Sequence, residues 1–215
     1  MPPLVVDEDT GLTIELLRAV EAVSDLRFAI EVVPYSRAKY QLRNGQASLI
    51  GHTPVGFESP GFYHYAQDLD WQVATGADLF ARDPAMLALE NTEDIYIGTP
   101  LGNAAFFAEL TGVPIQRFVE ASLPNLVQML AHGRVQILVF EAVSARRAIR
   151  DAGLSGVHYR HLADVHAGLA VRRDDAGSEL RRRLDAAIDK VDLEAIFGDY
   201  LEEAASGEAG VVLLP

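Results

Sequence analysis

Residues 130–141 read LAHGRVQILVFE, a pattern that joins the end of a helix to a buried strand. Gly133 stands where the helix must end, and glycine suits that position because it has no Cβ to oppose a positive φ. The apolar run that follows, residues 137–140, has the length and composition of a strand buried on both faces. The stretch therefore predicts a buried strand with the carboxylate of Glu141 at its tip.

The same plan occurs earlier in the chain, at residues 42–53, which read LRNGQASLIGHT. There Gly45 again separates a helix end from a short apolar strand, and the strand again ends on polar side chains. Each copy follows a strand and a helix, at residues 28–34 and 36–44 in the first copy, and at residues 114–119 and from Ser122 in the second. One α/β unit thus occurs twice, which predicts two similar lobes whose polar strand tips face each other.

The other patterns extend this plan along the whole chain. Helical spacing of apolar residues predicts helices at residues 12–23, 103–110, 142–152 and, with a break near 191–192, 178–205. Apolar runs predict strands at residues 77–82, 94–98, 158–162 and 167–172. Residues 52–61 are rich in glycine and proline and form a loop of the kind that often binds ligands, and residues 70–76 read as a connection. Strands that alternate with helices predict an α/β fold with mostly parallel sheets.

Composition excludes several classes of function. The chain has 215 residues, of which 49% are hydrophobic, and its net charge is 18 − 31 = −13. Such acidity argues against nucleic acid or an anionic membrane as the main partner. The chain has no cysteine, its six histidines lack metal-ligand spacing, and it carries none of the motifs HExxH, GxGxxG, GxSxG or the P-loop. We therefore expect no metal and no cofactor.

Four segments, taken in order, resemble a known family. They are the start of the chain from Pro2 to Gly11 with its helix, residues 34–53, residues 97–102, and residues 133–141 together with 168–175. This ordered set is similar to the bacterial extracellular solute-binding proteins of family 3, the amino-acid-binding receptors of ABC importers.

The resemblance implies the type II periplasmic binding fold, in which two lobes close on a ligand about a hinge. Lobe 1 would comprise residues 1–73 and 166–215, lobe 2 residues 76–163, and the crossing strands residues 71–76 and 163–166. It also implies a membrane permease as partner, a periplasmic or extracytoplasmic location, and no catalysis. The sequence shows no signal peptide and no apolar run of about 20 residues. A monomer is expected, with a domain-swapped dimer as the alternative.

Two features depart from the family. Its members bind the α-carboxylate of the ligand with an arginine in the loop after the buried strand of lobe 1, and residues 52–60 contain none. Its members also open with a central strand that this sequence lacks, whereas residues 210–215 form an apolar strand beyond the last helix. Our hypothesis is that this terminal strand fills the central position of lobe 1, as in a circular permutation, because an empty position would expose two strand edges.

The candidate ligand residues of lobe 1 cluster after its two strands. Tyr35 matches a position where the family places an aromatic ring against the ligand, and Arg37 is the nearest spare cation. The tip of the buried strand and its loop add Gly51, His52, Thr53 and Phe57. The alternative is structural: the tyrosine packs in the lobe and the histidine serves as a hydrogen-bonding group.

The candidates in lobe 2 are the start of a helix and the acidic strand tip. Thr99, Gly102 and Asn103 open a helix whose free N–H groups favour a ligand carboxylate. Glu141 matches an acid that binds the ligand's ammonium group in the family. The alternatives are plain helix capping and a surface carboxylate.

These features favour a solute-binding protein for a small cationic or zwitterionic molecule, such as an amino acid or an amine. One alternative is an enzyme on the same fold, similar to the cyclohexadienyl dehydratases, with Glu141 as the acid. Another alternative is the ligand-sensing domain of a signalling receptor.

Overall fold

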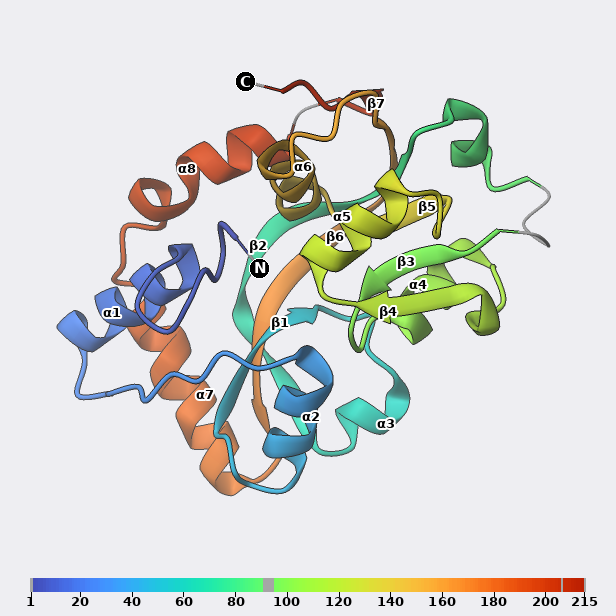
Figure 1. The fold of residues 1–215 in the computed structure, drawn as a ribbon. Coiled ribbons are helices and arrows are strands. Elements are labelled where there is room, and N and C mark those ends of the chain that lie inside the picture. Colours follow the sequence, from blue (N-terminus) through green and yellow to red (C-terminus); the bar gives the residue numbers. More distant parts are fainter. Residues whose placement is uncertain (1, 91–94, 206, 215) are drawn as a thin grey trace. The chain divides into compact units, whose positions relative to one another are not determined.

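The computed structural model describes residues 2–90, 95–205 and 207–214 (Figure 1). The chain forms two compact units. Unit 1 comprises Met1–Ala74 and Val165–Glu203, and unit 2 comprises Thr75–Asp164 and Ala204–Pro215. Two of the three boundaries fall inside long strands, β2 (Ala66–Ala81) and β6 (His158–Arg172), so each of these strands contributes to both units. The third falls at the end of the last helix, between Glu203 and Ala204. Movement of the units as lobes about these residues stays a prediction.

Unit 1 combines helices with the short strand β1 (Leu49–Pro54). β1 pairs antiparallel with the last residues of β6. The helices are α1 (Leu12–Val23), α2 (Tyr35–Arg43), α3 (Pro60–Tyr63), α7 (Asp175–Ile188) and most of α8 (Leu193–Ala204). Helix α2 buries Ala38 and Leu42 in a cluster with Ile50 and Phe62. This packing fixes the backbone of the helix that carries the ligand candidates Tyr35 and Arg37.

Unit 2 is built from β–α–β connections. Its strands are β3 (Ile97–Pro100), β4 (Phe118–Ala121), β5 (Ile137–Glu141) and β7 (Ala209–Val211). Its helices are α4 (Ala104–Thr111), α5 (Leu123–Ala131) and α6 (Ala142–Asp151), with 3-10 turns at Pro84–Ala88 and Ile115–Arg117. Every residue of β5 is buried, which agrees with the apolar pattern of the sequence.

The sheet is mixed rather than mostly parallel, with the strand order β1-β6-β2-β5-β3-β4 and β7 beside β6. β3 runs parallel to β4 and β5, as β–α–β connections require. The pairs β1–β6, β2–β5 and β6–β7 are antiparallel. The α/β fold class is confirmed, but the sheet is mixed rather than mostly parallel, because three strand pairs are antiparallel and one expected strand does not form.

The strand expected at residues 28–34 does not form. Unit 1 therefore lacks the β–α–β connection that this strand would have begun. These residues lie outside any helix or strand. The Phe28 N–H donates to the Glu21 side chain at 2.7 Å, and Val32 is 42% exposed. A strand needs a neighbour for its backbone groups, and among the described residues no strand pairs with this segment.

The glycines of the repeated pattern behave as expected. Gly45, after α2, has φ 71°, and Gly133, after α5, has φ 68°. Both values lie in the left-handed region that favours glycine. This part of the repeat is confirmed.

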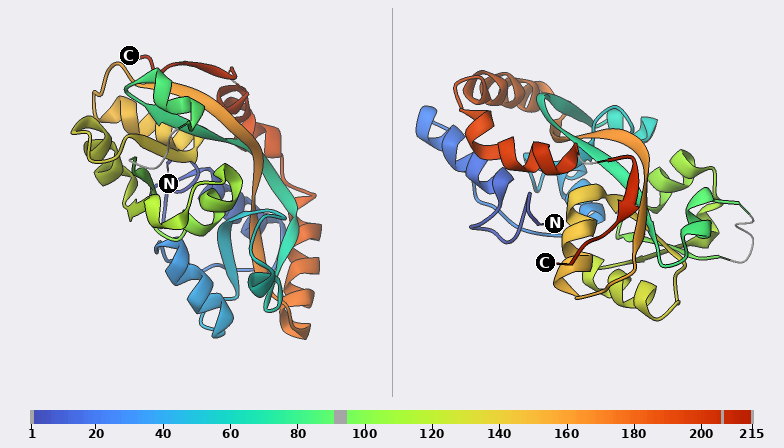
Figure 2. Two further views of the ribbon diagram at one scale, coloured as in Figure 1. Left: turned by 90° about the vertical axis from the view of Figure 1, so that its right-hand side faces the viewer. Right: turned by 90° about the horizontal axis from the view of Figure 1, so that it is seen from above.

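The terminal strand lies in a different place from the one expected. β7 pairs with His158–Arg160 of β6, and the last residues belong to unit 2 (Figure 2). The Val212 N–H donates to the Val157 carbonyl at 2.8 Å and the Val212 side chain is 4% exposed, so an apolar contact anchors this end. A Cβ on Gly210 would lie 2.9 Å from the Tyr159 hydroxyl, so a larger residue at this position would have to displace the Tyr159 ring. The hypothesis that residues 210–215 fill the centre of lobe 1 is therefore wrong.

Candidate functional site

Unit 1 holds a buried carboxylate with an aromatic ring and a cation against it. The Glu58 side chain is 8% exposed, and its Oε1 accepts a hydrogen bond from the Tyr35 hydroxyl at 2.7 Å. The same oxygen accepts from Lys39 Nζ at 3.1 Å. Lys39 Nζ also lies 4.5 Å from the centroid of the Tyr35 ring. Carboxylate and ring thus contact one ammonium group together.

Local structure explains this arrangement. Tyr35 opens α2, and Lys39 follows one turn later, a spacing that places two side chains on the same face of a helix. Glu58 lies in the turn between β1 and α3, next to Ser59, whose hydroxyl caps α3 by accepting from the Phe62 N–H. Strand and cap therefore fix the backbone on both sides of the carboxylate.

A second carboxylate of unit 1, that of Asp68, is held in the same manner. Its Oδ1 accepts from the Thr53 hydroxyl at 3.1 Å, and its Oδ2 accepts from the Tyr63 hydroxyl at 3.0 Å. The Tyr63 oxygen in turn accepts from the Gly56 N–H at 2.9 Å, which ties the loop to the cluster. Thr53 is fully buried at the tip of β1. We call Tyr35, Lys39, Thr53, Glu58, Tyr63 and Asp68 the acid–aromatic cluster.

The two phenols of the cluster stay protonated well above neutral pH. Burial, followed by the nearby charge of Glu58, raises the pKa of Tyr35 far above its ordinary value. Burial and the hydrogen bond to Asp68 raise the pKa of Tyr63 to about 12. Each phenol therefore keeps its proton and donates a hydrogen bond to a carboxylate oxygen at every physiological pH. The cluster joins negative charge to aromatic surface, which is the chemistry that binds cations.

The remaining candidates of lobe 1 lie outside this cluster. Arg37 is exposed on α2, and its Cζ lies 5.4 Å from the centroid of the Tyr40 ring. Phe57 is 50% exposed in the turn after β1. Gly51 is exposed on β1, where a Cβ would come within 2.3 Å of Leu169 Cδ2.

His52 points into unit 1 rather than to solvent. Its Nε2 lies 2.7 Å from the Thr13 hydroxyl, in the first turn of α1. Burial lowers its pKa to about 4, so the imidazole is neutral at pH 7. This contact joins β1 to α1 and corresponds to the structural alternative considered for this residue.

In unit 2, Glu141 caps the helix that follows it. Its Oε1 accepts from the Thr75 hydroxyl at 2.7 Å and from the Val143 N–H at 2.9 Å. Its Oε2 accepts from the Ser144 N–H at 2.8 Å. The side chain lies at the tip of the buried strand, as expected, and its residue is 8% exposed. Its carboxylate stabilises the N-terminus of α6.

The turn before α4 already holds a carboxylate of the protein. Glu120 Oε1 accepts from the Gly102 N–H at 2.8 Å and from the Ala104 N–H at 2.9 Å. The Asn103 side-chain amide donates to the Pro100 carbonyl at 3.0 Å. Thr99 is fully buried at the tip of β3, and its hydroxyl has no hydrogen-bond partner within the described chain. Glu120 thus takes the N–H groups that were expected to bind a ligand carboxylate.

Unit 2 also contains a buried ion pair that the sequence did not indicate. Asp78 Oδ2 lies 2.6 Å from Arg146 Nη2, and Asp78 is 1% exposed. Asp78 Oδ1 lies 3.1 Å from His161 Nδ1, and the Arg146 guanidinium lies 4.1 Å from the centroid of the Tyr159 ring. Such a pair fixes the side chains around it, and removal of one partner is strongly destabilising.

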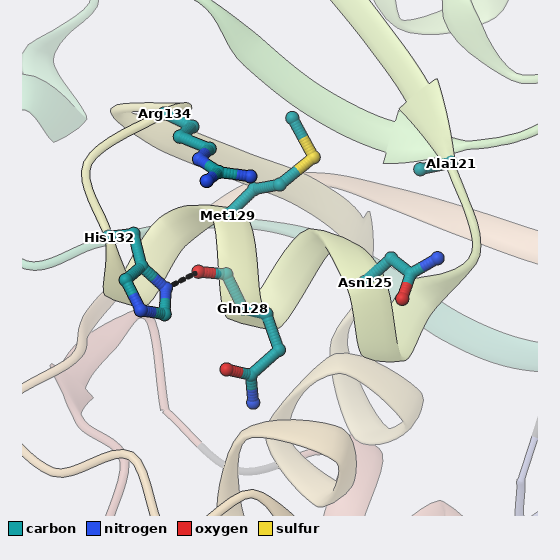
Figure 3. Close-up of a pocket in the computed structure, with 6 residues that line it drawn as sticks. All are labelled: Ala121, Asn125, Gln128, Met129, His132 and Arg134. Carbon is teal, nitrogen blue, oxygen red and sulfur yellow. Dashed lines mark hydrogen bonds between the residues drawn. The ribbon is translucent and has the colours of Figure 1, made fainter.

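A surface cavity of about 350 Å³ lies along α5 of unit 2 (Figure 3). Its lining residues are Ala121, Asn125, Gln128, Met129, His132 and Arg134. His132 Nδ1 donates to the Gln128 carbonyl at 2.7 Å, so this ring is fixed against its own helix. None of the ten candidate residues lines the cavity.

The described residues show no group of three or more His, Cys, Asp or Glu side chains that would hold a metal ion. Within the same residues, no helix has both the length and the apolar character to cross a membrane.

Solved structures share this arrangement of strands and helices along the whole chain. A histidine kinase sensor domain similar to periplasmic binding proteins superposes with a TM-score of 0.74 at 20% identity, covering 100% of this chain and 93% of its own. The fold is that of the periplasmic binding proteins. The arginine-, lysine-, histidine-binding protein ArtJ from Geobacillus stearothermophilus matches at TM-score 0.73 and 14% identity, covering 96% of this chain and 92% of its own.

A further structure with this fold belongs to work on glutathione import via GshT and the cystine ABC importer TcyBC of Streptococcus mutans. It matches at TM-score 0.76 and 14% identity and covers 94% of this chain and 91% of its own. No protein-family model and no curated protein sequence matches the chain. The comparisons therefore establish the periplasmic-binding-protein fold.

Sequence reasoning missed four members of the acid–aromatic cluster. Lys39 had a usable signal, because it follows Tyr35 by four residues in a helix. Glu58 also had one, since it lies in the loop already expected to bind ligand. Tyr63 and Asp68 had none, because their contacts depend on where β2 begins.

Proposed function

We propose that this protein binds a small molecule that carries an ammonium or guanidinium group, such as an amine or a basic amino acid. The observation that carries the proposal is the pairing of the buried Glu58 carboxylate with the Tyr35 ring around one cation. A carboxylate and a ring face are the groups that recognise organic cations. The second held carboxylate, Asp68, adds negative charge to the same unit.

The comparisons support a binding role for this fold. ArtJ is an arginine-, lysine-, histidine-binding protein, and another neighbour is an ancestral arginine-binding protein bound to glutamine. Both cover more than nine-tenths of this chain. We infer that this chain binds a solute and performs no chemistry on it.

The candidate residues offer few groups that would bind the carboxylate of an amino acid. Residues 52–60 contain no arginine, and Glu120 fills the N–H groups of the turn before α4. We therefore expect amines to bind more tightly than ordinary α-amino acids.

The biological role that we propose is delivery of the solute, outside the cytoplasm, to the membrane permease of an ABC importer. The second candidate is the sensing domain of a receptor, and the observation that favours it is the similarity to a histidine kinase sensor domain over the entire chain. Uptake of the identified amine by cells with and without the gene separates these roles, since only an importer component changes uptake.

A thermal-shift and calorimetry panel tests the binding proposal. The panel contains putrescine, agmatine, arginine, lysine, glutamate, acetate and glucose. At 100 times its dissociation constant, a ligand adds about 2.7 kcal/mol to the free energy of unfolding, which is easily visible. We expect shifts with the amines and basic amino acids, and weaker shifts or none with the acids and the sugar.

Glu58→Gln is the decisive variant, because it keeps the shape of the side chain and removes its charge. We expect amine affinity to fall at least tenfold. Glu202→Gln, at an exposed position of α8, is the matched control and should bind as the parent does. Shifts only with acids or sugars, or amine binding that Glu58→Gln leaves intact, would contradict the proposal.

A further inference from the structure

We propose that Lys39 is an internal competitor for the amine: its ammonium group occupies the cation position beside Glu58, and a ligand must displace it. This inference rests on the proposed function and adds to it a limit on affinity and a selectivity for the ligand charge. In the protein without ligand, the Lys39 ammonium group lies where the ammonium group of the bound solute would lie.

The contacts of Lys39 are those of a bound alkylammonium ligand. Its Nζ lies 3.1 Å from Glu58 Oε1 and 4.5 Å from the centroid of the Tyr35 ring. The Glu58 side chain is 8% exposed, so a cation reaches it only from a restricted direction. Two ammonium groups within a few ångströms repel each other strongly in such a site. A ligand cation and the Lys39 ammonium therefore exclude each other.

The Lys39 side chain is also able to leave. Its exposed fraction is 25%, so the ammonium group has a path to water. A lysine stem is long and flexible, and its strongly hydrated head can move to solvent while α2 stays in place. Tyr35 continues to hold Glu58 through its hydroxyl after Lys39 departs. The cation site beside Glu58 therefore stays intact when the Lys39 ammonium group leaves it.

This competition lowers the apparent affinity by the fraction of time that Lys39 spends away from Glu58. An ion pair that is partly exposed, together with a cation–ring contact, is modest in strength. Removing Lys39 should therefore tighten amine binding by about tenfold rather than by several orders of magnitude. A neutral solute gains nothing from the removal.

Lys39→Met is the main test, because methionine fills the space of the stem and carries no charge. We expect the dissociation constant of putrescine, measured by calorimetry, to fall about tenfold. The chain contains one other lysine, Lys190, which is exposed between α7 and α8, so Lys190→Met is the matched control and should bind as the parent does. Equal or weaker binding of putrescine to Lys39→Met overturns the inference.

Amine-reactive labelling of the parent protein tests the same inference without a substitution. A water-soluble acetylating ester modifies the small deprotonated fraction of each lysine amine, and mass spectrometry separates Lys39 from Lys190. Without ligand, Lys39 should react more slowly than Lys190. The added ligand is methylguanidine, because its guanidinium group is not acetylated and does not consume the ester. With methylguanidine, the reaction of Lys39 should become faster while that of Lys190 stays constant, because the ligand releases Lys39. Slower reaction of Lys39 with methylguanidine would mean that the ligand covers it, and would overturn the inference.

The outcomes separate this inference from the proposed function. If the parent and Lys39→Met bind putrescine equally, the competitor role fails while the amine site stands. If only Lys39→Met binds putrescine, Lys39 is confirmed as the occupant of the site. If no variant binds any amine, the proposed function fails and this inference fails with it.

Discussion

At the scale of the residue, the neutral imidazole of His52 links stability to pH. Its pKa in the folded protein is about 4, below the ordinary value of 6.5, because burial disfavours the charged form. Between these values the unfolded chain binds more protons, so the free energy of unfolding falls as the pH drops from 6.5 to 4. We expect His52 to contribute about 2 kcal/mol to this loss. Urea unfolding at pH 7.5 and pH 4.5 measures it.

His52→Gln isolates this effect from the titration of the carboxylates. At pH 7.5 the variant should be less stable by about 1 kcal/mol, because the contact with Thr13 is weakened. At pH 4.5 the gap should close or reverse, since glutamine has no proton to gain. His64→Gln, at an exposed position after α3, is the control, because it removes an imidazole that is not buried. An equal gap at both pH values would contradict the proposed role of burial.

Partners that come from distant parts of the chain explain why single residues were harder to predict than patterns. Tyr35 and Thr53 lie in the acid–aromatic cluster, but the residues that hold them, Glu58 and Asp68, arrive from a turn and from the start of β2. The turn at Gly102 offers its N–H groups to a carboxylate, but that carboxylate belongs to the protein and the N–H groups are not free. Its occupant, Glu120, is 18 residues away and has no signal near the turn.

At the scale of the element, α6 depends on its cap. Glu141→Gln keeps the size of the side chain, but its amide opposes the N–H of Ser144 and it loses the charge that complements the helix N-terminus. We expect the free energy of unfolding to fall by about 1–2 kcal/mol, measured by urea titration. Glu109→Gln, exposed on α4, should leave stability unchanged. A variant as stable as the parent would show that the cap contributes nothing.

The same Glu141→Gln protein decides whether unit 2 contributes to the proposed ligand site. A loss of amine affinity of tenfold or more in folded protein would give Glu141 the ligand role that the sequence suggested. Unchanged affinity would limit that residue to capping.

Elements with their own local signal were predictable, and elements defined by a neighbour were not. Gly45 and Gly133 end their helices as predicted because a left-handed turn is a property of a few consecutive residues. Residues 28–34 have strand composition, but no strand in the described part of the chain pairs with them. The opposite error concerns residues 70–76, which look like a connection. They lie inside β2, a long strand whose neighbour in the sheet is the similarly long β6.

At the scale of the whole molecule, β2 and β6 are shared by both units, so the two units should unfold together. The single tryptophan, Trp71, lies in unit 1 and is 8% exposed. Its ring centroid lies 5.4 Å from that of Phe197, which also belongs to unit 1, so its fluorescence reports on unit 1. Asp78 lies seven residues later on the same strand and forms the buried pair with Arg146 in unit 2. A substitution of Asp78 therefore perturbs unit 2, and the Trp71 fluorescence shows whether unit 1 responds.

Asp78→Asn should lower the free energy of unfolding by about 3 kcal/mol, because it leaves the buried Arg146 charge without this carboxylate. For a chain of this size, that loss corresponds to a fall in Tm of roughly 6–12 °C. If the shared strands couple the units, the Trp71 fluorescence transition moves as far as the transition seen by circular dichroism. A fluorescence transition that stays at the parent temperature, while circular dichroism shows an earlier step, would mean that unit 1 survives alone and that continuous strands do not make unfolding cooperative.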